Sequence, residues 1–141
     1  MKDTTSLGLR IAEGDLDAAG AMLHTGRHLY AAFQAHQSCE ESLKAWFRNA
    51  APCRPPFIHD LEALAVRAGL DEPSLARRLA RLSGYYIASR NPKDWDRLRA
   101  ATTEAIASAL VQTAREVLAW SRQQTTSTGS SEPMPPPSSD T

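Results

Sequence analysis

Cysteine and long hydrophobic runs are what this 141-residue sequence has least of. It contains 2 cysteines, Cys39 and Cys53, which are too few for a disulfide scaffold, so we expect reduced thiols. No hydrophobic run approaches the length that spans a membrane, and the first residues contain no apolar targeting segment. These absences predict a cytoplasmic protein that makes no contact with a membrane.

The signatures of several enzyme classes are missing as well. The sequence contains no glycine-rich phosphate loop, no nucleophile elbow and no cysteine and histidine spacing that fits a metal. His24, His28 and His36 follow one another at short intervals, but they lack a convincing further ligand and a fixed geometry. We therefore expect no metal and no cofactor, and the sequence alone identifies no catalytic residue.

Charge is balanced over the whole chain but uneven along it. The 16 basic residues match 16 acidic residues in number. Residues 77–99 nevertheless contain 7 basic and 2 acidic residues, a local excess of +5 (7 − 2). The basic residues are Arg77, Arg78, Arg81, Arg90, Lys93, Arg97 and Arg99. Such an excess attracts a phosphate or an acidic partner, although a solvated face balanced by acidic neighbours has the same appearance in a sequence.

Apolar residues recur every three or four positions, which predicts helices, and no segment has the pattern of a strand. We expect helices from Thr5 or Ser6 to a cap at Gly26, over residues 28–49, over 59–68, from 71 into the tyrosine pair at 85–86, and over 102 or 103 to 122. A proline-rich connection follows residue 50, and residues 87–95 are expected to form a loop. This pattern predicts an all-α protein, an antiparallel up-and-down four-helix bundle with a short extra helix.

The ends of the chain are expected to lie outside this bundle. Residues 1–5 are predicted to be a flexible N-terminus and residues 6–124 the helical domain. From residue 125 the composition changes to Thr, Ser, Gly, Glu and Pro, which bury too little apolar surface to offset the entropy of ordering. Residues 125–141 are therefore predicted to be a disordered tail.

The segment 28–49 combines an apolar stripe with a polar edge. Apolar and small side chains face inward from Phe33 to Phe47 at helical spacing. Gln37, Glu40 and Lys44 run beside that stripe. Glu40 and Lys44 are spaced for an intrahelical ion pair, whereas Gln37 and Glu40 could instead contact a partner subunit.

Four short motifs occur in a characteristic order. They are Ala12-x-x-Asp15-Leu16, Gln37-x-x-Glu40-x-x-x-Lys44-Ala45, His59-Asp60-Leu61-x-x-Leu64 and Leu82-x-x-Tyr85-Tyr86-Ile87-x-Ser89-Arg90-x-Pro92. Together they resemble the HEPN family (higher eukaryote and prokaryote nucleotide-binding domains) over about residues 6–124. The resemblance implies a bundle that is often dimeric, and it is greatest for bacterial members that pair with a minimal nucleotidyltransferase.

The sequence departs from the motif of the ribonucleases in that family. Those members carry an arginine, then four to six residues, then a histidine, but in this chain Arg90 and four intervening residues are followed by Trp95. No histidine follows His59, and Asn91 stands where close relatives have tyrosine. Arg54 and His59 have the right spacing, but they lie in the proline-rich connection. An exposed arginine and a histidine near a helix start are the simpler interpretation of that pair.

Arg90 is the strongest candidate for a functional residue because it lies in a connection between helices. It could hold a phosphate bidentately, with Lys93 adding charge and Tyr86 a ring or a hydroxyl. Alternatively, Arg90 pairs with Glu40 or Glu41 and locks the bundle. The candidate residues for binding a nucleotide, RNA or partner are therefore Arg90, Lys93, Tyr86, Glu40 and Gln37.

Three functions remain open from the sequence. The first is a binding and regulatory HEPN module, a homodimer paired with a nucleotidyltransferase in a toxin–antitoxin-like or nucleotide-binding system. The second is a metal-independent endoribonuclease toxin with a degenerate Arg/His motif, in which Arg90 holds an RNA phosphate. The third is a bundle that serves assembly alone.

Overall fold

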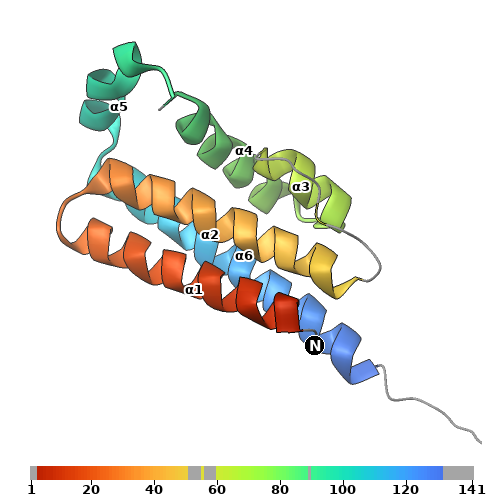
Figure 1. Cartoon of the computed structure of the whole chain (residues 1–141). Helices are drawn as coiled ribbons and strands as arrows, with labels where there is room; N and C mark the ends of the chain where they lie inside the picture. Colours follow the sequence, from red (N-terminus) through yellow and green to blue (C-terminus); the bar gives the residue numbers. More distant parts are fainter. Residues whose placement is uncertain (1–2, 51–54, 56–59, 89, 132–141) are drawn as a thin grey trace, which may run out of the picture.

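The computed structural model describes residues 3–50, 55, 60–88 and 90–131, and these residues form helices and no strand (Figure 1). The elements are α1 (Asp3–His24), α2 (His28–Asn49), α3 (Leu61–Ala68), α4 (Pro73–Ala88), a 3-10 turn η1 (Pro92–Asp94), α5 (Trp95–Ala101) and α6 (Glu104–Ser131). The predicted all-α helical bundle is confirmed. None of these helices is both long enough and apolar enough to pass through a lipid bilayer.

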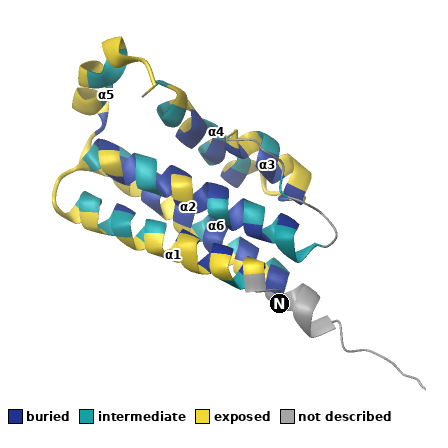
Figure 2. Cartoon of the chain, viewed as in Figure 1, coloured by how far each residue is buried: buried dark blue, intermediate teal, exposed yellow. Residues whose placement is uncertain are grey.

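Helix α2 lies at the centre of the bundle and packs against α1, α3, α4, α5 and α6. Figure 2 shows buried residues along its length, and more than half of its 22 residues are buried. Many of these are small, including Ala31, Ala32, Ala35 and Ser38. Small side chains allow neighbouring helices to approach closely, so one helix can be covered on several sides.

The main core lies between α2, α3, α4 and α6. Several of its large members have no exposed surface, among them Leu43, Leu61, Leu79 and Val111. Burying a side chain of this size contributes roughly 1.5–3 kcal/mol. A smaller cluster joins α1 to α2 and α6.

Buried hydroxyls fix the register of the long helices. Ser38 Oγ on α2 donates to the carbonyl of Ala12 on α1 at 2.8 Å. Ser121 Oγ on α6 donates to the carbonyl of Ser42 on α2 at 2.6 Å. A buried donor without its acceptor costs about 1–3 kcal/mol, so sliding either helix along α2 is unfavourable.

Two helix ends have the caps that their residue types favour. Gly26 between α1 and α2 has φ +81°, as its predicted capping role requires. The Asp60 side chain accepts hydrogen bonds from the backbone N–H groups of Glu62 and Ala63, which caps α3. Pro52, Cys53, Arg54 and His59 lie outside the described residues.

Both ends of the chain contain more helix than expected. Helix α1 begins at Asp3, and Thr5 is fully buried, so the expected flexible segment 1–5 is wrong from residue 3. Helix α6 continues to Ser131, so the tail predicted from residue 125 is wrong as far as 131. Thr125 is also fully buried, and its hydroxyl donates to the Ser121 carbonyl at 3.0 Å. Bonding within the helix lets a threonine be buried where composition suggested disorder.

The loop expected at 87–95 is also corrected. Helix α4 continues to Ala88, and after the connection a 3-10 turn leads into α5. Asn91 Oδ1 accepts a hydrogen bond from the backbone N–H of Lys93 at 3.1 Å, which caps the turn that Pro92 opens. None of the α5 residues is buried, and the sequence therefore shows no apolar stripe there.

An arginine and a glutamate clamp α4 to α6. Arg78 donates from both terminal nitrogens to the two carboxylate oxygens of Glu116, each at 2.9 Å. The hydrogen bond from Arg78 lowers the pKa of Glu116 from its ordinary value of 4.5. A carboxylate with a lowered folded-state pKa stabilises the fold above its unfolded pKa, and this stabilisation is lost as the pH falls through the folded value.

We predict that Arg78→Gln lowers the free energy of unfolding at pH 7 by less than about 1 kcal/mol, because the pair is partly exposed. The difference from the parent should shrink as the pH falls below the unfolded pKa of glutamate and vanish below the folded pKa of Glu116, where Glu116 is protonated in both variants. Urea denaturation at a series of pH values measures this difference in the free energy of unfolding. The exposed Arg67→Gln, which leaves the clamp intact, should follow the parent at every pH, and a difference for Arg78→Gln that is constant with pH would contradict the assignment.

Candidate binding site around Arg90

Arg90 is exposed and lies just beyond the end of α4. Its Nη1 donates a hydrogen bond to the Tyr86 hydroxyl at 2.8 Å, and its guanidinium carbon lies 5.2 Å from the centre of the Tyr86 ring. The face of an aromatic ring attracts a cation at this distance. The Arg90 side chain is therefore held in a defined position at the surface.

The Tyr86 ring is in turn held in place by a contact with α2. Its ring stacks on the His36 imidazole, with ring centres 4.2 Å apart and planes 13° from parallel. His36 is only 1% exposed. The stack connects the end of α4 to the interior of the bundle, so the position of Arg90 depends on the packing of α2.

Glu40 lies one helical turn after His36 on α2 and contacts two polar side chains. Its Oε1 lies 3.9 Å from His36 Nδ1, and its Oε2 accepts a hydrogen bond from Lys44 Nζ at 2.8 Å. The Glu40 side chain is 7% exposed and that of Lys44 13%. The ion pair predicted between Glu40 and Lys44 is confirmed, in a setting that is nearly buried.

The remaining candidate residues lie at the surface. Gln37 is exposed on α2, next to His36 in sequence, and Lys93 is exposed on η1. Within the described part of the chain, Arg90 forms no ion pair with Glu40 or Glu41, contrary to the alternative drawn from the sequence. Tyr86 and His36 lie between Arg90 and Glu40.

The structure adds an aromatic cluster that the sequence did not reveal. The Trp95 ring on α5 contacts Tyr30 and Phe33 of α2, with ring centres 5.8 and 5.7 Å apart. These contacts fasten α5 to the bundle, which agrees with a packing role for Trp95. The spacing of Tyr30 and Phe33 on one helix face was the only signal available, and nothing in it pointed to Trp95.

Potential metal ligands do not gather in the described residues, where no group of three His, Cys, Asp or Glu side chains could hold an ion. Cys39 is completely buried in the core, and burial raises the pKa of its thiol. Among the described residues, the features around Arg90 suit recognition of an anionic group by a cation.

The comparisons with known proteins identify the family. The HEPN domain family matches residues 6–124, and the chain belongs to this family. No curated protein matches.

Two solved structures share the fold. TT1696 from Thermus thermophilus superposes with a TM-score of 0.76 at 22% identity, over 87% of this chain and 99% of that one. ST0689, described as an archaeal HEPN homologue, gives a TM-score of 0.74 at 19% identity, over 89% of this chain and 99% of that one. At these identities the likeness supports the helical architecture.

We predict that Lys44→Met destabilises the protein by on the order of 2 kcal/mol, because the buried Glu40 carboxylate loses its 2.8 Å partner. This is less than the ~3–5 kcal/mol typical of completely buried pairs, since Lys44 retains some contact with water. Urea denaturation at pH 7 measures the change.

Two further variants test the cause. The exposed Lys93→Met should be close to neutral, and the double variant Glu40→Gln/Lys44→Met should regain part of the lost stability, since no buried charge remains. If Lys44→Met is as stable as Lys93→Met, the pair contributes nothing to the fold.

Proposed function

We propose that this HEPN protein is a binding and regulatory module, a homodimer that pairs with a minimal nucleotidyltransferase in a toxin–antitoxin-like or nucleotide-binding system. The observation that carries the proposal is the support beneath Arg90. Its guanidinium is exposed, yet it is held by Tyr86, which stacks on the buried His36. A surface cation that is already in position loses little entropy when it binds an anionic group.

The remaining donors of Arg90 are suited to such a group. A guanidinium has five N–H donors in a fixed fork, and the structure uses the Nη1 group for Tyr86. The others can meet a carboxylate of a partner protein or a phosphate. Lys93, three residues further on, is exposed and adds a second positive charge.

Other exposed cations of α4 and η1 support an acidic partner. Arg77 and Arg81 on α4 are exposed, as are Arg90 and Lys93. Arg78 does not belong to this group, because Glu116 neutralises it. Among the polar residues Gln37, Glu40 and Lys44 of α2, Gln37 is the exposed one. It would form neutral hydrogen bonds at the border of the contact with the partner.

The experiment coexpresses the chain with the product of the neighbouring reading frame. We expect that frame to encode a minimal nucleotidyltransferase and the two proteins to copurify, with two copies of this chain by light scattering. Arg90→Ala should weaken the complex about tenfold or more, which corresponds to about 1.4 kcal/mol. Arg67→Ala on α3, which is equally a loss of one exposed charge, is the matched control.

Several outcomes would overturn this function. A neighbouring reading frame that encodes another class of protein would contradict the expected partner, and a single copy of the chain in the complex would contradict the homodimer. Equal binding by Arg90→Ala and Arg67→Ala would contradict the role of Arg90. Self-association that is insensitive to Arg90, without any partner, would favour a bundle that serves assembly alone.

A metal-independent endoribonuclease is the second candidate, because an imidazole lies in the same stack as Arg90. Such cleavage needs a base for the 2′-hydroxyl and a cation for the phosphate. His36, however, is only 1% exposed and is covered by the Tyr86 ring, so it cannot reach an RNA backbone in this conformation.

We therefore predict that the purified protein does not cleave single-stranded RNA in the presence of EDTA, as followed on denaturing gels. The parent and Arg90→Ala should give the same background. Cleavage that persists in EDTA and disappears in both Arg90→Ala and His36→Gln would establish the ribonuclease instead, provided both variants keep their helical circular dichroism.

A further inference from the structure

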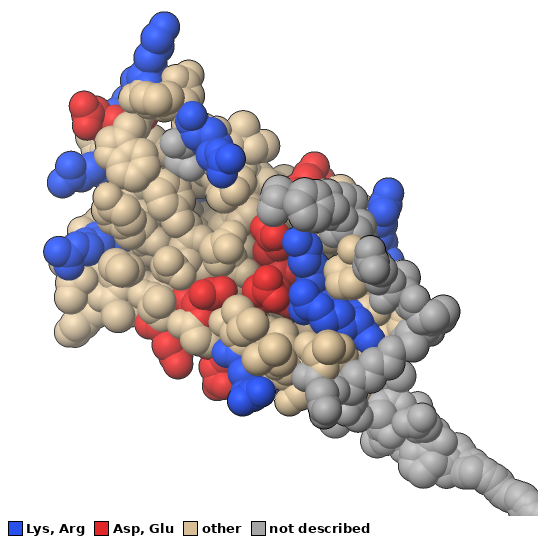
Figure 3. Space-filling model, viewed as in Figure 1, with Lys and Arg blue, Asp and Glu red and all other residues tan. Residues whose placement is uncertain are grey.

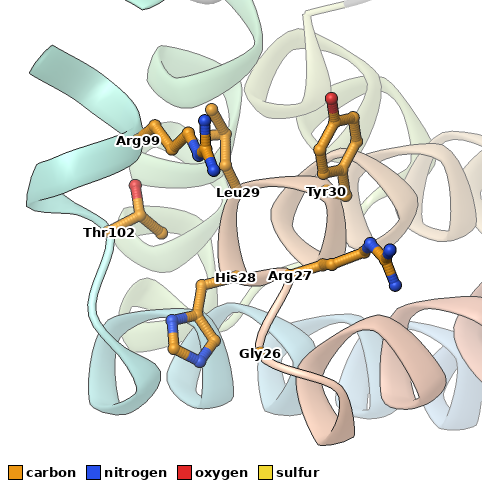
Figure 4. Close-up of a pocket in the computed structure, with 7 residues that line it drawn as sticks. All are labelled: Gly26, Arg27, His28, Leu29, Tyr30, Arg99 and Thr102. Atoms are coloured by element: carbon orange, nitrogen blue, oxygen red, sulfur yellow. The ribbon is translucent and has the colours of Figure 1, made fainter. Parts of the chain in front are cut away.

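A hollow of about 150 Å³ lies between α1 and α2. It is lined by Thr4, Leu7, Gly8, Ile11, Glu41 and Arg48. The hollow beside α5 is different, because its lining includes Arg27 and Arg99, whose side chains extend away from each other (Figure 4). The hollow between α1 and α2 is instead bordered by two large apolar side chains of α1, and its surroundings suit an apolar contact.

The outer face of α1 carries an apolar stripe along the helix. Leu7 and Ile11 lie one turn apart on it and are 49% and 45% exposed. Gly14, Ala18 and Ala21 continue the line, and Gly14 and Ala21 are exposed as well. Successive members of this outer stripe are four and three positions apart in turn, which is the spacing with which one α-helix packs along another. The residues that α1 contributes to the core lie on its other side.

Gly14 lies in the middle of the outer stripe, and the packing of one chain does not require a glycine there. Among the described residues, a Cβ atom at this position would meet nothing within 4 Å. A glycine inside a helix is less favourable than an alanine, so Gly14 lowers the stability of α1 without a packing benefit inside the chain. The close approach of a second helix would provide that benefit, because a position without a side chain leaves room for a large residue of the neighbour.

Large residues occupy one half of the outer stripe and small residues the other half. In an antiparallel pair of α1 helices, with a twofold axis between residues 11 and 14, Ile11 of one copy lies against Gly14 of the other. Leu7 lies against Ala18 in the same register, so each large side chain meets a small one. A parallel pair would instead set Ile11 against Ile11 and Gly14 against Gly14, which leaves the small halves apart. The distribution of side-chain size therefore favours the antiparallel pair.

The charges beside the outer stripe agree with this register. Arg10 and Asp17 are both exposed, and they lie two turns apart on α1, too far to pair within one helix. Within the described residues neither forms an ion pair, whereas Glu13 of the same helix pairs with Arg122 of α6 at 3.1 Å. The antiparallel pair brings Arg10 of each copy next to Asp17 of the other. Opposite charges at such flanking positions select the partner and the orientation of paired helices.

We propose that the outer stripe of α1 is the contact between two copies of this chain, paired antiparallel about a twofold axis. This inference rests on the homodimer of the proposed function and assigns its surface. Figure 1 shows α2 between α1 and α4, so a contact through α1 leaves Arg90 of each copy open to another partner. A single pair of helices is a small interface, and the dissociation constant of the dimer is therefore expected in the micromolar range.

The test is sedimentation velocity of the full-length protein alone over a series of concentrations, in which we expect the parent to show a monomer–dimer equilibrium. Arg10→Asp and Asp17→Arg should each weaken the dimer about tenfold or more, because like charges then face each other. The double variant Arg10→Asp/Asp17→Arg should return to within about threefold of the parent, since opposite charges face each other again. Arg115→Asp, which reverses an exposed charge of α6 outside the stripe, is the matched control.

Two glycines of α1 provide a steric test. Gly14→Ala should raise the urea midpoint of the monomer, because the added methyl has room there and alanine favours a helix. The same methyl should weaken the dimer about tenfold, since it occupies the space for Ile11 of the second copy. Gly20→Ala has the same room on the same helix but lies off the stripe, so it should raise the midpoint and leave the dimer unchanged.

The outcomes separate this contact from the proposed function. A dimer that is equally strong in the parent, Arg10→Asp and Gly14→Ala would overturn the α1 contact and leave the homodimer standing. A loss in Arg10→Asp that the double variant does not restore would overturn the antiparallel register. A parent that stays monomeric at the highest concentration would overturn both the contact and the homodimer, whereas binding of the nucleotidyltransferase is decided separately by the coexpression.

Discussion

The burial of α2 on several sides is the constraint on which the rest of this structure depends. A helix in contact with five other helices cannot carry large side chains all round, and α2 meets this limit with alanine and serine. The serines also connect backbones, since Ser38 bonds to α1 and α6 bonds to Ser42. Burial and hydrogen bonding thus specify the same register, and this agreement makes the arrangement of the long helices unique.

A central helix also imposes a cost wherever it carries a polar group. His36 and Glu40 are buried on α2, and a buried polar group must be matched by its surroundings. Lys44 provides a charge for Glu40, and Tyr86 provides a flat ring for His36. The second contact extends from the core to the surface, because Tyr86 also holds Arg90. Packing requirements inside the bundle therefore position the exposed cation.

The parts that could be predicted from the sequence are those encoded by periodicity within one helix. The bounds of α2 follow from the glycine before it and the prolines after it, and its Glu40–Lys44 pair follows from the spacing of the two residues. The short helix α5 buries none of its residues, so it leaves no periodic trace. Near the end of α6, Thr125 is buried with its hydroxyl bonded within the helix, which composition does not reveal. The stacking of Tyr86 on His36 depends on how α4 crosses α2, and intrahelical spacing contains no information about the crossing.

Ion pairing divides the cations of this protein into two groups. Arg48, Arg78 and Arg122 each lie within 4.0 Å of a glutamate, so their charge is largely cancelled within the bundle. Figure 3 shows basic and acidic side chains next to one another over part of the surface, while other basic side chains stand apart from acidic ones. Among the residues that the structure describes, Arg90 and Arg99 have no such carboxylate partner, and they lie on either side of η1 and the start of α5 in the chain. A chain with no net charge can therefore still present cations that stand apart from carboxylates, because the acidic residues that balance them lie elsewhere in the chain.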